Sequence, residues 1–114
     1  MKKDIQTITE ALIKFRDARD WKQFHDSKNL ALALSLEAAE LNELFLWKTA
    51  PEDIESVSKE RIAEELADVF SFAFLLAEKH QLDVKEIVLN KIAENDKKYP
   101  VDKAKGTAKK YNEL

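Results

Sequence analysis

Glycine and proline are almost absent from this chain, and their scarcity constrains the fold more than any other feature. One glycine and two prolines occur among 114 residues. Strands are joined by tight turns rich in these residues, so the composition argues against an all-β domain and for long, uninterrupted helices. We therefore predict an all-α fold, a four-helix bundle formed by a single domain over residues 1–114, with a polar tail from about residue 100.

Apolar residues recur at steps of three and four along four stretches of the chain, which is the spacing of an amphipathic helix. The four predicted helices lie at about residues 4–20, 29–47, 58–80 and 83–99. Residues 21–28 are expected to form a loop.

Local signals help to place the helix boundaries. Thr49 and Glu52 stand at capping-box spacing around a proline, so a short extra turn is expected there. Asp83 and Glu86 form the same pattern at the start of the fourth helix. Pro100 is expected to end that helix, because the residue before a proline is pushed out of helical geometry. The tail is polar and basic, and its pattern assigns no structure.

Composition excludes several functional classes. A formal net charge of -3 with 36% charged residues describes a mixed surface, so binding to nucleic acid is not expected. The chain has no cysteine, which removes disulfides, zinc-thiolate sites and thiol nucleophiles and suits a cytoplasmic protein. The N-terminus shows no signal-peptide core, and the longest nearly apolar run, residues 69–77, is far shorter than the roughly 20 residues that span a bilayer. No membrane insertion is expected.

Carboxylates interrupt the apolar stripes of two predicted helices. Glu37 shares its face with leucines at steps of three and four, and Glu40 lies one turn further on. In the third helix Glu65 falls on the stripe of Ile62, Val69, Phe72 and Leu76, and Asp68 follows it by three. The bland interpretation is that these are surface acids at the edge of a stripe, and it weakens when two helices show the same pattern.

Inward-facing carboxylates need a cation, because an unpaired carboxylate out of water costs several kcal/mol. One possibility is a protein cation such as Lys91, and the other is a metal ion. Four oxygen ligands without cysteine or histidine suit Mg²⁺, with Mn²⁺ as a possible substitute. A di-iron bundle is excluded, because neither His25 nor His80 has a glutamate three residues before it.

The acids also carry a resemblance to a known family. "EAAE" at residues 37–40, followed by "EELAD" at residues 64–68, resembles the ExxE...ExxD signature of the MazG-like all-α nucleotide pyrophosphohydrolases. "RDWKQFHDSKNLALAL", "ELFLWK", "KIAENDKKYP" and "KGTAKKY" resemble the corresponding segments of the dCTP pyrophosphatase branch, in the same order. The similarity covers nearly the whole chain.

This resemblance implies an enzyme that hydrolyses nucleoside triphosphates to a monophosphate and pyrophosphate with Mg²⁺. The residues matching the signature, and therefore the expected catalytic and metal-binding residues, are Glu37, Glu40, Glu65 and Asp68. A carboxylate-bound Mg²⁺ suits the reaction, because it neutralises charge on phosphate oxygens and activates water.

The resemblance also implies a substrate pocket. Residues matching Trp21, His25 and Trp47 form the base pocket in the dCTP pyrophosphatase branch, while Lys91 and Asn95 match positions that contact the nucleotide. Unaided, the tryptophans would be read as core packing and the fourth helix as an ordinary charged face. Two departures are Phe72, where that branch has a tyrosine, and Lys79, where it has an arginine.

Subunits of the family pair their helices across a dimer, often within a tetramer. The third predicted helix is apolar on much of its circumference, more than one small core requires. We therefore expect a homo-oligomer, a tetramer, acting on dCTP or modified dCTP as a house-cleaning enzyme. The alternatives are the same fold acting on dUTP or a broad set of triphosphates, and a catalytically silent bundle that binds nucleotides or a protein.

Overall fold

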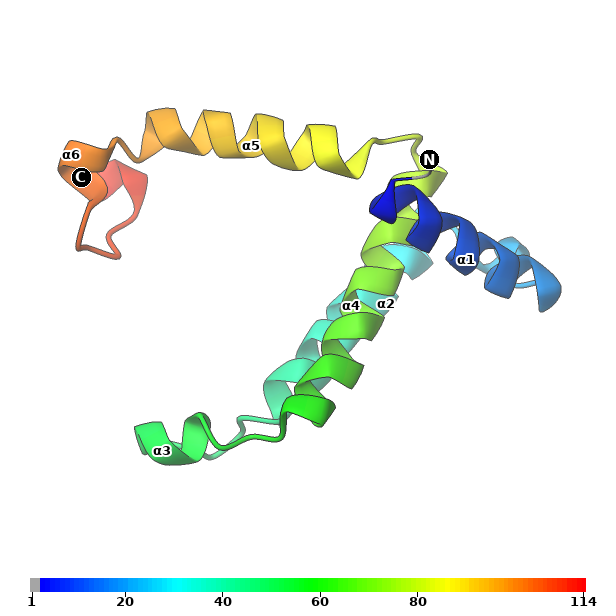
Figure 1. The fold of residues 1–114 in the computed structure, drawn as a ribbon, viewed down its shortest axis with the longest axis horizontal. Helices are drawn as coiled ribbons and strands as arrows, with labels where there is room; N and C mark the ends of the chain where they lie inside the picture. The colour runs from blue at the N-terminus through cyan, green and yellow to red at the C-terminus, as the bar shows by residue number, and fades with distance from the viewer. Residues whose placement is uncertain (1–2) are drawn as a thin grey trace. The chain divides into compact units, whose positions relative to one another are not determined.

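The structure is a computed structural model that describes residues 3–114, and these residues form helices joined by loops, with no strand among them. Figure 1 shows the helices in chain order. The α-helices are α1 (Asp4–Ala18), α2 (Ser27–Glu43), α3 (Pro51–Ile54), α4 (Lys59–Lys79), α5 (Val84–Lys98) and α6 (Val101–Ala104). Two short 3₁₀ helices, η1 (Lys22–Phe24) and η2 (Tyr111–Glu113), complete the set. The predicted all-α class with four long helices is confirmed.

Contacts divide the chain into two compact units, one up to Gln81 and one from Leu82 to Leu114. The assignment of residues 1–114 to a single domain stays a prediction. No helix within residues 3–114 is both long and apolar enough to cross a membrane.

The first unit is built on the pairing of α2 with α4, which lie side by side and run in opposite directions (Figure 1). The start of α2 meets the end of α4, where Ser27 Oγ and His80 Nε2 are 2.9 Å apart. Helix α1 also contacts α4. The buried apolar side chains among the described residues are few, and Leu30 is the most buried of them at 2% exposure. The others are Leu44, Leu75 and Ala77.

Capping side chains fix where several helices begin. Asp83 accepts a hydrogen bond from the Glu86 N–H at 2.9 Å, as the sequence predicted. Asp26 does the same for α2, accepting from the Asn29 N–H at 2.7 Å, so this helix begins two residues before its predicted start. The connection between α1 and α2 therefore spans residues 19–26 instead of the predicted 21–28, and it contains η1.

Two boundary predictions were wrong. The capping box at Thr49 does not form, because Pro51 holds the preceding Ala50 in an extended conformation and Ala50 itself becomes the N-cap. Helix α2 ends at Glu43 instead of Trp47, because the following N–H groups of Phe45 and Leu46 bond three residues back and tighten the chain into turns.

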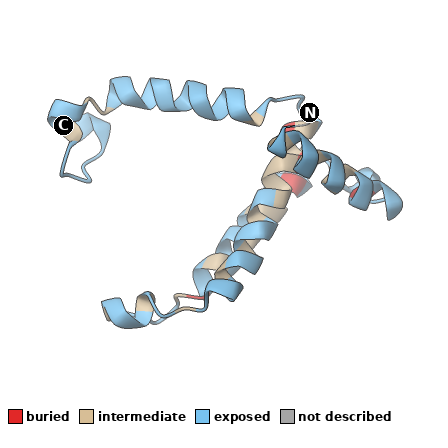
Figure 2. Cartoon of the chain, in the orientation of Figure 1, coloured by how far each residue is buried: buried red, intermediate tan, exposed pale blue. Residues whose placement is uncertain are grey.

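The second unit holds α5, α6 and η2. Its tail, which the sequence pattern left unassigned, folds back so that Tyr99 and Tyr111 meet edge to face at 6.1 Å between ring centroids. The Lys98 ammonium lies 5.1 Å from the centroid of the Tyr111 ring. Gly106, with φ +81°, supplies the left-handed turn between them. Helix α5 itself has no buried residue (Figure 2).

Candidate functional site

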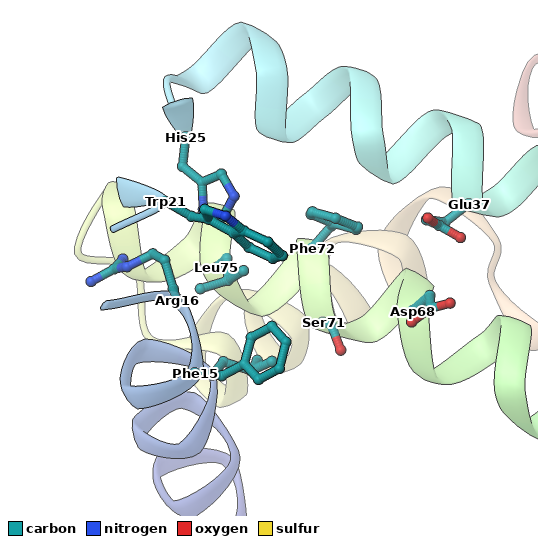
Figure 3. A pocket seen from close by; sticks show the side chains of 10 residues that line it. Phe15, Arg16, Trp21, His25, Glu37, Asp68, Ser71, Phe72 and Leu75 are labelled. Carbon is teal, nitrogen blue, oxygen red and sulfur yellow. The ribbon is translucent and has the colours of Figure 1, made fainter. Parts of the chain in front are cut away.

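Three of the predicted acids converge between α2 and α4. Glu37 projects from α2, and Glu65 and Asp68 project from α4, with one carboxylate oxygen of each within 4.8 Å of the others. Figure 3 shows the Glu37 and Asp68 side chains pointing toward one another across the two helices. The antiparallel pairing of the helices brings together residues that are about thirty positions apart in the sequence.

The electrostatics of the cluster reflect its crowding. Burial, a hydrogen bond to Glu40 and the negative charges of Glu40, Asp68 and Glu65 together raise the pKa of Glu37 to about 7. The pKa of Glu65 is also raised, by burial first and then by the charge of Glu40. Glu40, the fourth predicted acid, is exposed and is not one of the three converging acids, although its charge contributes to the raised pKa of both Glu37 and Glu65.

The cluster fits a hard divalent cation. The Oε2 atoms of Glu37 and Glu65 are buried and have no hydrogen-bond partner in the protein. A buried acceptor oxygen without a donor costs free energy. Because carboxylate oxygens of three residues converge here, a bound cation is the natural partner for them. The donor set is carboxylate oxygen throughout, which suits Mg²⁺ or Mn²⁺.

Glu37 and Asp68 form one end of a pocket of about 420 Å³, a size within the usual range for small-molecule sites. Figure 3 shows aromatic side chains at the other end, and Phe72 between the two ends. The lining residues are Leu12, Phe15, Arg16, Trp21, His25, Glu37, Asp68, Ser71, Phe72 and Leu75.

Aromatic edge-to-face contacts order the other end of the pocket. Phe15 and Trp21 meet at 5.7 Å between centroids, and His25 and Phe72 at 6.4 Å. The Nδ1 atom of His25 is buried and has no partner in the protein. Burial and, to a smaller extent, the charge of Arg16 lower the pKa of His25, which favours the neutral imidazole.

Trp47, predicted for the same pocket, lies outside it within the chain. It follows the turns after α2 with a left-handed backbone, φ 64°, and it is 90% exposed. Residues with bulky side chains rarely adopt this backbone conformation. At Trp47 it accompanies an indole ring that lies in solvent. Sequence spacing could not reveal this, because the direction of a loop side chain depends on turn geometry.

The two predicted substrate residues of the second unit are both exposed on α5. The Lys91 ammonium lies 3.5 Å from the Glu94 carboxylate, which Lys98 shares at the same distance. The Asn95 side chain is exposed. Its backbone carbonyl oxygen accepts a hydrogen bond from the backbone N–H of Tyr99 at the end of the helix. Lys91 is therefore paired on its own helix.

Several lining residues were not predicted from the sequence. Phe15 is one, and Arg16 is another, the one buried charged side chain among residues 3–114. Arg16 lies four residues after Leu12, within the apolar stripe of α1. A charge in an apolar stripe was the signal that identified Glu37, and it was available here too.

Comparison with known proteins places the chain in a family. The model of the MazG-like family matches residues 32–114. The dCTP pyrophosphatase 1 of Mus musculus is 40% identical over 114 residues, an alignment that covers 96% of this chain and 67% of the mouse protein. The Homo sapiens dCTP pyrophosphatase 1 is 37% identical with the same coverage.

A solved structure agrees with these relatives. The crystal structure of a pyrophosphatase from Archaeoglobus fulgidus matches with a TM-score of 0.83 and 33% sequence identity, covering 88% of this chain and 95% of that one. The chain belongs to the MazG-like family. It is a hydrolase of the pyrophosphohydrolase class.

Proposed function

We propose that this enzyme hydrolyses nucleoside triphosphates, dCTP or modified dCTP in particular, to the monophosphate and pyrophosphate with Mg²⁺. The observation that carries the proposal is that the two ends of one pocket differ in chemistry, with a cluster of carboxylates at one end and aromatic rings at the other. A nucleoside triphosphate matches this arrangement, because it has a chain of phosphates at one end and a flat base at the other. The names of the mouse and human relatives support dCTP as the nucleotide.

The acidic end is proposed to hold the metal. Glu37, Glu65 and Asp68 supply the converging oxygens, and Glu40 completes the set from beside them. A divalent cation bound there neutralises charge on the phosphate oxygens and lowers the pKa of a water molecule. The four carboxylates hold the phosphates near α2 and α4 only through such a cation, because carboxylates and phosphates alone would repel each other.

The aromatic end is proposed to hold the base. Trp21 offers a ring face for stacking, which contributes roughly 1 to 3 kcal/mol per base. His25, neutral and with an unpartnered Nδ1, can hydrogen-bond the base edge. Trp47 remains a proposed base-pocket residue, and since it is 90% exposed in one chain it would act in the pocket of a second copy. Lys91 and Asn95 are proposed to contact the nucleotide from α5.

We also propose a homo-oligomer, a tetramer. Helix α5 is 15 residues long and has no buried residue, while Ile87, Val88, Leu89 and Ile92 are all more than two fifths exposed. An isolated helix of this length is marginal in water unless an apolar face is covered. Phe70 of α4, 51% exposed, adds to the uncovered apolar surface. A second copy would cover these side chains, and we place this house-cleaning enzyme in the cytoplasm.

A panel of nucleoside triphosphates tests the activity. We expect pyrophosphate release from dCTP with Mg²⁺, little release without it, and a lower specificity constant for purine nucleotides. Preference for dUTP or equal rates on all triphosphates would move the assignment to another substrate within the same reaction. No release from any triphosphate, with or without Mg²⁺ or Mn²⁺, would leave a silent binding protein and overturn the proposal.

A further inference from the structure

Arg16 is buried where the last turn of α1 meets the last turn of α4. It is 6% exposed, it lies in the last turn of α1, and it lines the aromatic end of the pocket. Its Nε donates to Asp17 Oδ1 at 2.8 Å, and its Nη1 donates to Glu78 Oε2 at 3.3 Å. Glu78 belongs to the last turn of α4, so this ion pair joins α1 to α4 across 62 positions of sequence.

The backbone of Arg16 holds the start of the next loop. Its carbonyl oxygen accepts the N–H of Arg19 at 3.2 Å and that of Trp21 at 3.1 Å. Asp20, with φ 54°, makes the left-handed turn that allows the second bond. Arg16 therefore binds the backbone of Trp21 through its carbonyl oxygen and binds α4 through its side chain.

The guanidinium is in the wrong place to bind phosphate. Figure 3 shows it beside Trp21 and His25, at the opposite end of the pocket from Glu37 and Asp68. Two carboxylates already accept hydrogen bonds from it. A buried cation held in this way costs desolvation energy that apolar packing would avoid, so its benefit is better sought in geometry than in stability.

We propose that Arg16 is a positioning residue for the base end of the pocket. By tying α1 to α4, it fixes the loop that presents Trp21 and His25 to the nucleobase, and so sets the fit of the base. This inference rests on the proposed function, because it takes the aromatic end to be the base site. It adds a determinant of base affinity that neither stacks on the base nor contacts the phosphates.

The test compares the two ends of the substrate in one enzyme. Arg16→Met keeps the length of the side chain and removes its hydrogen bonds. We expect the KM for dCTP to rise by about 10-fold with a smaller change in kcat, since misplacing a binding group mainly weakens binding. The inhibition constant of inorganic tripolyphosphate, which can occupy only the phosphate end, should stay unchanged.

Three further variants sharpen the test. Glu78→Ala cuts the same tie from α4, outside the pocket, and should raise the KM for dCTP in the same direction. Arg16→Lys keeps a charge and should give an intermediate KM. Lys14→Met, an exposed cation on the same helix, is the matched control and should leave the KM unchanged.

The outcomes are separable. An unchanged KM in both Arg16→Met and Glu78→Ala, or an equal loss of dCTP and tripolyphosphate binding, would overturn the positioning role. If Arg16→Met does not fold, Arg16→Lys and Glu78→Ala decide by the same comparison. If the unmodified enzyme releases no pyrophosphate, the proposed function fails, and dCMP binding followed by tryptophan fluorescence then decides the role of Arg16 by comparing these variants with the unmodified chain.

Discussion

At the scale of single residues, the site is a collection of groups that would be unfavourable elsewhere. Glu37 and Glu65 bury oxygens without donors, His25 buries a ring nitrogen without a partner, and Trp47 exposes an indole on a strained backbone. Such groups persist where a ligand completes them. The carboxylates and the imidazole gather at one pocket, which separates this helical hairpin from an ordinary one.

Removing a carboxylate from the cluster should stop the reaction without unfolding the protein. Glu40→Gln and Asp68→Asn are each expected to lower kcat at least about 100-fold, because each takes a charged ligand from the cation. Circular dichroism should stay helical, and the thermal midpoint without metal should rise, since like charges are removed. Glu60→Gln, an exposed acid in the first turn of α4, is the control. Substantial turnover in either variant would contradict the ligand assignment.

The raised pKa of Glu37 predicts a pH dependence of stability. Its pKa moves from an ordinary 4.5 to about 7, so between these values the folded state binds more protons than the unfolded state. Stability of the metal-free protein should therefore fall as pH rises through this window. Mg²⁺ should raise the thermal midpoint more at pH 8 than at pH 5, because the cation needs ionised carboxylates.

Calorimetric scans at several pH values, with Mg²⁺ and with a chelator, measure both effects. Glu37→Gln should flatten the pH dependence of the metal-free midpoint. A metal-free midpoint that rises steadily from pH 5 to pH 8 in the unmodified protein would show that the carboxyl is not held in its neutral form.

At the scale of elements, caps and spacing determined most of what the sequence could predict. The 3.6-residue period located four long helices, and Asp83 marked the start of α5. The capping box at Thr49 failed because a proline imposed the cap position on Ala50. The convergence of the acids followed from their place in two apolar stripes, whereas the direction of Trp47 followed from turn geometry that no periodicity encodes.

Trp47, in the turns after α2, has either a role in base stacking or a structural role, and a substitution distinguishes the two. If it stacks on a base, Trp47→Ala should remove roughly 1 to 3 kcal/mol of binding, or about 5- to 150-fold in specificity constant for dCTP. Since the side chain is 90% exposed within the chain, the thermal midpoint should change little. Pyrophosphate release and the midpoint are measured on one preparation of the variant.

A structural role for Trp47 would give the opposite pair of results. Truncating a tryptophan that is buried in an interface or core costs about 3 to 5 kcal/mol, so the midpoint would fall sharply. Unchanged kinetics in the remaining folded enzyme would then remove Trp47 from the base pocket. Leu46→Ala, the exposed neighbour on the same turn, shows how much of any change belongs to the turn itself.

At the scale of the whole molecule, the exposed apolar side chains of α5 and α4 predict association. Light scattering at micromolar concentration should give a mass at least twice the 13.2 kDa of one chain, and four times that value for the tetramer. Ile92→Glu, on the exposed side of α5, should lower the mass by placing a charge against an apolar partner. A monomer with full activity at the same concentration would contradict the oligomer.

The antiparallel pairing of α2 and α4 bears on the order of folding. The two helices are joined by residues 44–58, which include α3, and contacts between segments close in sequence form more quickly than contacts between distant ones. Because the acids that converge lie on these two helices alone, the contacts that pair α2 with α4 also bring like charges together. A cation that offsets this repulsion would favour the pairing of the two helices during folding as well as in the finished enzyme.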